Sequence, residues 1–383
     1  MLRPLLRNRQ AASDPGSAIE LVERCLQSAI ECGASDIHFH PRRESWDVSF
    51  RIDGVLQPAV THPRCPDSDP VSRLMSMAGL PSYRGGVPLE GSLCFTSHEG
   101  DTREMRLGVF PTVHGNRAAL RVTEPQRVRQ LEQLGLGSNT HEQLQMICEA
   151  RDGWLLVAGP AGSGKTTTLY ACLNAIAQST SRRSVMTIED PVEAVIDSIS
   201  QSQLQPTGGL TLAAALKAAV RQDAEVLLVS EIRDEATAEA VLSASMTGHL
   251  CFSSIHAATI GATLSRLVQM QLPSFAIRSG LRGILCQRLL RQVCSSCAND
   301  ANPNCETCYG TGYRGRFPIA QLIDLQNSPL EDDFLENQTA GQLDKWVQEQ
   351  GVESLREQAT TAIAQGRTDE SEVFRVLGTE HVG

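Results

Sequence analysis

Apolar residues in the first third of the chain recur with two different periods. Residues 17–30 place them at helical spacing, and Gly33 follows just beyond the expected helix. Residues 36–40 alternate polar with apolar side chains, as a half-buried strand does. Further strands are predicted at residues 46–52, 91–96, 104–111 and 117–122, with Asp53-Gly54 as a two-residue hairpin signal. This part of the chain predicts a small α+β domain.

From about residue 134, short apolar runs alternate with helical patterns. Strands are predicted at residues 154–158, 185–188, 226–230 and 250–255. Helices are predicted at residues 166–177, 212–221, 236–246, 262–270 and 275–291. Such alternation indicates an α/β domain whose largely parallel sheet is covered by helices on both faces. Its ligand should lie beyond the carboxyl ends of the strands.

These patterns give an expected division of the chain. Residues 1–16 are expected to form a flexible basic tail, residues 17–123 the α+β domain, and residues 134–383 the α/β domain. Residues 124–133 begin with a cluster of proline and charged residues and are expected to link the two domains.

Composition excludes several classes of protein. Among 383 residues, 34 Lys and Arg stand against 44 Asp and Glu, and aromatic residues make up 4%. This balance argues against a broad nucleic-acid-binding surface. No apolar run approaches the ~20 residues that span a bilayer, and no apolar segment follows the N-terminal arginines as it would in a secretory signal. Most of the 12 cysteines are scattered in apolar contexts, which indicates reduced thiols and a cytosolic location.

The segment between the first strand and the first helix of the α/β domain has the composition of a phosphate-binding loop. It reads Gly159, Pro160, Ala161, Gly162, Ser163, Gly164, Lys165, Thr166, Thr167. Glycines let backbone N–H groups converge on phosphate oxygens, and the helix N-terminus adds partial positive charge. Lys165 can reach the β- and γ-phosphates, and the Thr166 hydroxyl can ligate Mg²⁺. A chance glycine turn is the alternative, but every fixed position and both flanks match, so we expect nucleoside triphosphate binding.

Acidic residues follow the next two predicted strands. Glu189, Asp190 and Glu193 come after the second strand and could orient water or hold the hydration shell of a metal. An acidic surface turn is the alternative for this group. Glu231 follows the third strand, the usual place of a Mg²⁺-linked carboxylate downstream of a P-loop. Asp234 has the simpler role of capping the next helix.

Two histidines flank the fourth predicted strand. His249 precedes it and His256 follows it. A histidine at the strand end could sense the γ-phosphate, or could be a satisfied polar residue without a catalytic role.

Four cysteines form two CxxC pairs, Cys294 with Cys297 and Cys305 with Cys308. Two such pairs supply four thiolates to one tetrahedral Zn²⁺. Two disulfides or free thiols are the alternative, which a cytosolic location disfavours. Zinc sites of this kind also occur in nucleic-acid-binding ribbons, but basic and aromatic residues adjoin this one only at residues 313–316.

Taken together, these motifs resemble those of the secretion ATPases of type II secretion and type IV pilus systems. Residues 159–167 match the Walker A loop of that family, residues 187–193 resemble its aspartate box, residues 226–234 its Walker B region, and residues 247–249 with His256 its histidine box. Residues 34–38, 51–54 and 111–117 resemble signature segments of its PAS-like domain, residues 305–316 the end of its zinc module, and residues 355–356 and 369–373 its C-terminal helices.

The resemblance implies a RecA-like P-loop ATPase domain with a tetracysteine zinc module at residues 294–308, preceded by a small PAS-like domain. It implies a homo-hexamer that uses ATP, Mg²⁺ and Zn²⁺ and drives assembly of a pilus or pseudopilus through an inner-membrane platform protein. The motor would be cytoplasmic, would reach the inner membrane through its partners, and would not bind nucleic acid.

The same resemblance assigns roles to individual residues. Glu193 would polarise the attacking water, Glu231 would be the Walker B glutamate, and His256 would belong to the nucleotide site. Arg106 and Arg121, in the first domain, would act on the phosphates like arginine fingers. The zinc module favours the assembly branch of the family over the retraction branch.

The sequence also departs from the family pattern. Ser230 stands where a glycine usually precedes the Walker B glutamate, and we expect the first N-terminal domain of the family to be missing, with residues 1–16 in its place. A retraction-type ATPase, a nucleic-acid motor with a zinc ribbon and a nucleotide-binding paralogue without turnover remain as alternatives. The acidic balance weighs against the second, and the intact Lys165, Thr166, Glu193 and Glu231 weigh against the third.

Overall fold

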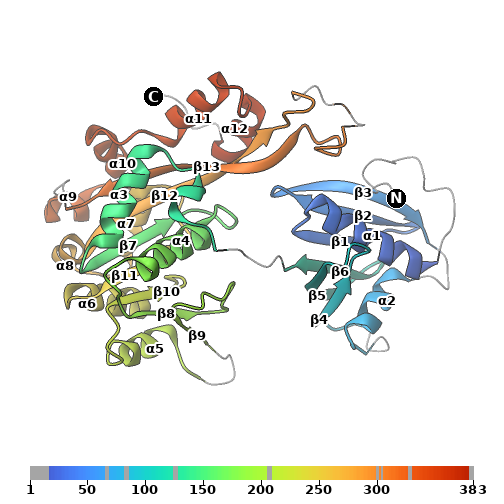
Figure 1. Ribbon diagram of the computed structural model, residues 1–383, viewed down its shortest axis with the longest axis horizontal. Helices are drawn as coiled ribbons and strands as arrows, with labels where there is room; N and C mark the ends of the chain where they lie inside the picture. The colour runs from blue at the N-terminus through green and yellow to red at the C-terminus, as the bar shows by residue number, and fades with distance from the viewer. Residues whose placement is uncertain are drawn as a thin grey trace. The chain divides into compact units, whose positions relative to one another are not determined.

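The computed structural model describes residues 17–64, 69–81, 86–123, 128–204, 209–298, 302, 305–326 and 330–378. The expected tail and residues 124–127 of the expected linker lie outside these ranges. Internal contacts divide the chain into two units, labelled by element in Figure 1. The first unit comprises Met1–Pro125 and Arg291–Gly315, and the second comprises Gln126–Leu290 and Arg316–Gly383. By contacts, the cysteine pairs therefore group with the first unit, although we expected them within the second domain.

The first unit is built on an antiparallel sheet with the strand order β3-β2-β1-β6-β5-β4. The strands are β1 (Asp36–Pro41), β2 (Ser45–Ile52), β3 (Val55–Pro63), β4 (Leu89–Thr96), β5 (Thr102–Thr112) and β6 (Gly115–Val122). Helices α1 (Ala18–Cys32) and α2 (Pro70–Met77) share one apolar core with the sheet, to which Leu26, Leu74 and Phe39 contribute. The expected α+β character of this region is confirmed.

Local sequence signals account for the ends of these elements. The Ser17 hydroxyl accepts a hydrogen bond from the Glu20 N–H at 3.3 Å and so caps α1, while Gly33 ends the helix in the left-handed conformation. Asp53 and Gly54 both adopt positive φ, at 48° and 82°, between β2 and β3. Positive φ at both central positions is what the two-residue hairpin turn requires, because it matches the twist of the flanking strands.

The second unit contains a sheet with the strand order β13-β12-β7-β11-β10-β8-β9. Its strands are β7 (Gly153–Ala158), β8 (Val185–Glu189), β9 (Ser200–Gln203), β10 (Val226–Val229), β11 (Leu250–Ile255), β12 (Leu281–Val293) and β13 (Tyr313–Asp324). All neighbouring pairs from β12 to β9 are parallel. The strands expected at residues 154–158, 185–188, 226–230 and 250–255 correspond to β7, β8, β10 and β11, which confirms the largely parallel sheet.

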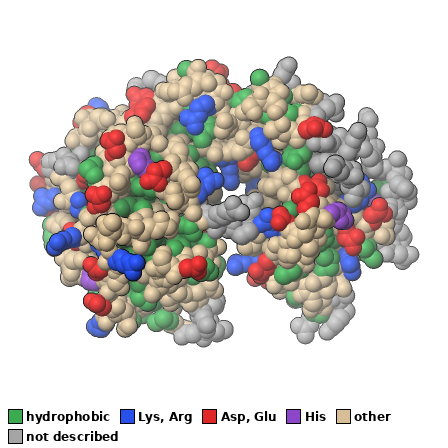
Figure 2. Space-filling view, viewed as in Figure 1, with side chains coloured by type: hydrophobic (Ala, Val, Ile, Leu, Met, Phe, Trp, Pro, Cys, Tyr) green, Lys and Arg blue, Asp and Glu red, His purple; other side chains and the backbone are tan. Residues whose placement is uncertain are grey.

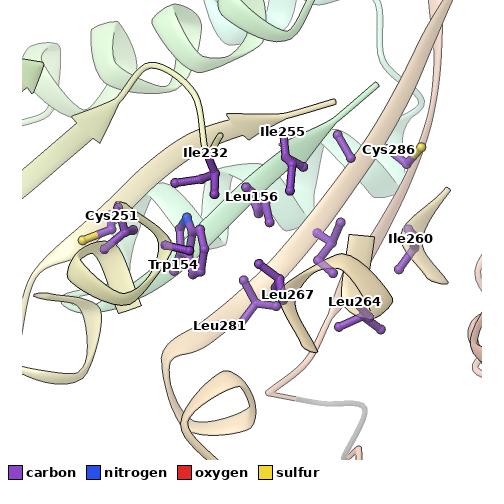
Figure 3. Packing of buried hydrophobic residues seen from close by; sticks show 14 of the residues in the cluster. Trp154, Leu156, Ile232, Cys251, Ile255, Ile260, Leu264, Leu267, Leu281 and Cys286 are labelled. Atoms are coloured by element: carbon purple, nitrogen blue, oxygen red, sulfur yellow. The ribbon is translucent and has the colours of Figure 1, made fainter. Parts of the chain in front are cut away.

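Helices cover both faces of this sheet. They are η2 (Leu131–Leu134), α3 (Ser138–Glu149), α4 (Lys165–Gln178), α5 (Leu212–Ala219), α6 (Glu235–Met246), α7 (Ile260–Gln269), α8 (Ser274–Gly280), α9 (Asp332–Asn337), α10 (Ala340–Glu349), α11 (Leu355–Ala364) and α12 (Glu370–Leu377). Alternate residues of β7 enter different cores: Leu155 packs with α3 and α4, whereas Trp154 and Leu156 pack with α6, α7 and α8. Figure 3 shows the second of these cores around Trp154 and Leu156. Strands buried on both faces explain why these runs are apolar at every position.

The helix expected at residues 275–291 is confirmed only as far as Gly280, and the prediction is wrong for the residues that follow. Helix α8 ends at Gly280, and Leu281 begins the thirteen-residue strand β12, which pairs with β7. Most of β12 is buried, so its apolar residues do not alternate with polar ones and a strand cannot be told from a buried helix by period. A close approach favours the strand, because a β-carbon at Gly283 would lie 2.9 Å from the Ile323 carbonyl oxygen of β13.

No helix among the described residues combines the length and the apolar character needed to cross a membrane. On the face drawn in Figure 2, acidic and basic side chains of the described residues are interspersed.

We predict that Gly283→Ala destabilises the second unit by about 1–3 kcal/mol, because the added methyl group would be overpacked against the Ile323 carbonyl. Gly341→Ala is the matched control. A β-carbon at Gly341, within α10, would have no neighbour within 4 Å, and alanine is the better helix former. Chemical denaturation of both variants would measure the difference. Equal stability of the two variants would contradict the close approach of Gly283 in β12 to Ile323 in β13.

Candidate active site

The phosphate-binding loop joins β7 to α4, as its sequence context requires. Three of its glycines have φ in the left-handed region, with values of 156° at Gly159, 74° at Gly162 and 91° at Gly164. A β-carbon at Gly159 would lie 2.8 Å from the Gln287 carbonyl oxygen, and a β-carbon at Gly164 would lie 2.8 Å from Gln287 Nε2. Both conformation and space therefore demand glycine at these two positions.

Lys165, the first residue of α4, is buried, with 8% of its surface exposed. Its Nζ donates hydrogen bonds to the carbonyl oxygens of Gly159 at 2.9 Å and Pro160 at 3.0 Å. Burial lowers the pKa of Lys165, and the nearby carboxylates of Glu231 and Glu193 oppose that effect. The structure thus brings both predicted carboxylates into electrostatic range of the P-loop lysine.

His256 connects the lysine to Glu231. Its Nδ1 lies 3.4 Å from Lys165 Nζ, and its Nε2 lies 3.3 Å from Glu231 Oε1. Because an ammonium group can only donate, Nδ1 is the acceptor and the ring proton sits on Nε2, facing the carboxylate. Arg233 contacts the second oxygen of Glu231 at 3.0 Å. The ends of β7, β10 and β11 therefore deliver Lys165, Glu231 and His256 to one place.

His249 and Asp234 have local roles. His249 Nδ1 lies 3.0 Å from the Ala244 carbonyl oxygen in the last turn of α6. His249 precedes β11, whereas His256 follows that strand. Asp234 caps the start of α6, accepting a hydrogen bond from the Thr237 N–H at 2.8 Å. Neither belongs to the group around Lys165.

The loop suits an anion and a divalent cation. The buried Ser163 hydroxyl has no hydrogen-bond partner among the described residues, and no side chain caps the N-terminus of α4. A phosphate group would satisfy these donors. Thr166 and Glu231 offer the oxygen ligands that Mg²⁺ prefers. The residues present therefore fit ATP with Mg²⁺.

Two further residues of this site, Gln287 and Arg288, were missed in the sequence. Gln287 Nε2 donates to the Ser163 carbonyl at 2.7 Å, and the Thr168 hydroxyl donates to Gln287 Oε1 at 2.9 Å. Arg288 is buried and donates to the Ala258 carbonyl at 2.5 Å. Two adjacent polar residues within an apolar run could have indicated a functional role. The signal was missed because a helix was expected at residues 275–291.

Arg106 and Arg121 lie in the first unit, directly opposite each other on β5 and β6. Opposed residues of paired strands emerge on the same face of a sheet. Arg121 is 75% exposed and pairs with Asp36, its Nε lying 3.3 Å from Oδ1. The shared face expected from the sequence is therefore present.

The four CxxC cysteines converge in the first unit. Their sulfur atoms lie within 4.8 Å of one another, with Cys294 and Cys305 at 3.8 Å and Cys297 and Cys308 at 3.7 Å. Tetrahedral Zn–S bonds of about 2.3 Å place ligand sulfurs about 3.8 Å apart, whereas a disulfide needs about 2.05 Å. The group fits one Zn²⁺ and excludes the disulfide alternative.

Comparison with known proteins shows the family of this chain. A family model described as type II/IV secretion system protein matches residues 11–375. Type II secretion system ATPase E of Vibrio cholerae is 33% identical, over 95% of this chain and 76% of that protein. Type IV pilus assembly ATPase TfpB of Acinetobacter baylyi is 34% identical, over 97% of this chain and 67% of that protein.

A solved structure extends the agreement to the fold. The ATPase DotB of Legionella pneumophila superposes with a TM-score of 0.72, covering 95% of this chain and 96% of that one at 19% identity. The expected fold class is confirmed in its main features: an α/β P-loop ATPase unit, a smaller α+β unit and a tetracysteine group, which contacts place with the smaller unit. The chain belongs to the type II/IV secretion system protein family.

Proposed function

We propose that this chain is an ATP-hydrolysing motor that powers assembly of a pilus or pseudopilus, in type IV pilus biogenesis or type II secretion, at the bacterial inner membrane. The observation that carries the proposal is the group formed by Lys165, His256 and Glu231, with Glu193 in electrostatic range, beside a glycine-dependent loop. The similar proteins named above are ATPases of these two systems.

Binding of ATP would use the loop as it stands. Lys165 would turn from the carbonyl oxygens of Gly159 and Pro160 towards the β- and γ-phosphates. Mg²⁺, when bound, would neutralise charge on the same phosphates, with Thr166 and Glu231 on its side of the site. His256, between Lys165 and Glu231, is placed to change partners when a γ-phosphate enters.

Hydrolysis requires a base for the attacking water. Glu193 would accept a proton from that water as its oxygen bonds to the γ-phosphorus and the bond to ADP breaks. Arg106 and Arg121 would add positive charge that stabilises the transition state. Their shared sheet face supports this role, since both guanidinium groups are presented together.

The assembly of the motor is part of the same proposal. We expect a homo-hexamer that reaches the membrane through an inner-membrane platform protein, as the resemblance to type II secretion and type IV pilus ATPases implies. The tetracysteine group favours the assembly branch over retraction, and its four thiolates leave no open position for catalysis, so its Zn²⁺ would be structural.

We predict that Glu193→Gln binds ATP normally but hydrolyses it ~10²-fold more slowly, the scale of a lost general base. Lys165→Ala, in contrast, should lose nucleotide binding. In a bacterium that carries this gene, its deletion should abolish pilus assembly or type II secretion, and the wild-type gene but not the Glu193→Gln variant should restore it. Full restoration by Glu193→Gln, or turnover that depends on single-stranded DNA, would refute the proposed motor.

We predict that the double substitution Arg106→Ala with Arg121→Ala lowers ATP turnover about 10-fold or more, given the larger effects of arginine fingers. Arg103→Ala is the control, because Arg103 lies on the same strand three residues away and pairs with Asp101 at 3.2 Å. Successive side chains of a strand point to opposite faces of the sheet, so Arg103 lies on the opposite face from Arg106 and Arg121. Equal turnover in the double variant and the control would remove the arginines from the chemistry.

We predict one Zn²⁺ per chain, lost in Cys297→Ser with Cys308→Ser and retained in Cys94→Ser, whose thiol is exposed and outside the cluster. Because metal binding supplies much of the stability of such small modules, the double variant should also become protease-sensitive within residues 294–312. Metal analysis of protein purified without chelator, with limited proteolysis, tests both effects. Stoichiometric zinc in the double variant would contradict the assignment.

A further inference from the structure

A buried carboxylate stands at the end of β8. Glu189 is 2% exposed and accepts hydrogen bonds from the hydroxyls of Tyr170 at 2.5 Å and Thr187 at 2.6 Å, and from Gln201 Nε2 at 3.1 Å. Among the described residues, no Lys, Arg or His nitrogen lies within 4 Å of it. A carboxylate buried against neutral donors alone is costly, because no opposite charge offsets its removal from water. Packing alone therefore gives no reason for Glu189.

Tyr170 links this carboxylate to Glu193. Its hydroxyl donates to Glu189 and at the same time accepts a hydrogen bond from the Glu193 backbone N–H at 3.2 Å. Burial, followed by the hydrogen bond to Glu189, raises the pKa of Tyr170, so the hydroxyl keeps the proton that it donates. Glu189 thereby fixes the direction of the Tyr170 O–H bond. A lone pair of the Tyr170 hydroxyl oxygen then faces the Glu193 N–H and accepts its hydrogen bond.

Gln201 of β9 holds the residues that follow. Its Nε2 donates to the Ala194 carbonyl at 3.0 Å as well as to Glu189, and its Oε1 accepts from the Ile196 N–H at 2.6 Å. The segment from Glu193 to Ile196 has no helix or strand of its own. Side-chain hydrogen bonds that converge on Glu189 therefore take the place of secondary structure there.

We propose that Tyr170 and Glu189 are positioning residues for Glu193, holding its backbone at a fixed distance from the phosphate-binding lysine. The inference rests on the catalytic role proposed for Glu193. Tyr170 lies five residues after Lys165 on α4, about 7.5 Å along the helix axis. One rigid helix therefore carries the group that binds phosphate and also anchors the backbone of the group that activates water.

Such an arrangement predicts a particular kinetic defect. Losing the Tyr170 hydroxyl removes one hydrogen bond from the Glu193 backbone but leaves Lys165 and the loop glycines intact. Binding of ATP should persist while the chemical step slows, because displacement of a reacting group by about 1 Å can cost ~10²-fold in rate.

The test uses the full chain and compares Tyr170→Phe and Glu189→Gln with Ser253→Ala. Ser253→Ala also removes a buried hydrogen bond from the same sheet, that from Trp154 Nε1 at 2.6 Å, but this bond has no link to the Glu193 segment. We expect kcat to fall about 10-fold or more in the first two variants, with the Kd for a fluorescent ATP analogue within about threefold of wild type. Ser253→Ala should keep its kcat within about twofold.

A double-mutant cycle separates positioning from general stability. If Tyr170 acts through Glu193, Tyr170→Phe should lower kcat no further in a Glu193→Gln background. Hydrogen exchange should also quicken at residues 192–196 in Tyr170→Phe and remain unchanged at β7 and β11.

The outcomes distinguish this inference from the proposed function. A slow Glu193→Gln together with a fast Tyr170→Phe would overturn the positioning role alone, as would a fully additive loss in the double variant. Full turnover by Glu193→Gln would overturn the catalytic assignment and the positioning role with it. A fall in kcat matched by an equal loss of ATP affinity would show that Tyr170 supports the loop rather than Glu193.

Discussion

A buried ammonium group sets the arrangement of the second unit. Removing Lys165 from water disfavours its charged form, so the charge persists only where acceptors and carboxylates surround it. Carbonyl oxygens of its own loop supply part of this environment, and Glu231 and Glu193 supply the rest. These carboxylates are far from Lys165 in sequence. A parallel sheet brings them together because its strands all end at one edge.

Strand β12 of the same sheet also shapes the loop around Lys165. Gln287 occupies the space that side chains at Gly159 and Gly164 would fill, and its amide holds the Ser163 carbonyl. The loop is thus shaped by a strand more than 120 residues later in the chain. Tyr170 and Gln201 extend the same principle to the Glu193 segment, where side chains fix a backbone that belongs to no regular element. Rigid elements and the irregular segments between them are tied by single polar side chains.

How far the sequence predicted this structure depended on whether the information was local. The loop glycines, the strands β7, β8, β10 and β11, and the Asp53-Gly54 turn follow from neighbouring residues, and each was predicted. Strand β12 was not, because a strand buried on both faces has no period that separates it from a helix. Once β12 was taken for a helix, Gln287 and Arg288 could not be placed beside the loop. Tyr170 was missed for another reason: on sequence it resembles any aromatic residue of a buried helix face.

The cysteine group shows the same limit in another form. Its four ligands were predicted from the spacing of the cysteines alone, because two short CxxC segments supply all four thiolates. Its surroundings were not: the Tyr309 hydroxyl donates to the Glu31 carbonyl at 3.2 Å, and Arg314 Nη1 donates to the Cys32 carbonyl at 3.2 Å. Both acceptors are main-chain carbonyl oxygens at the end of α1. Every residue has such an oxygen, so the pattern of side chains could not predict these two contacts. Such contacts group Arg291–Gly315 with the first unit, although the strands that lead into and out of this segment belong to the sheet of the second.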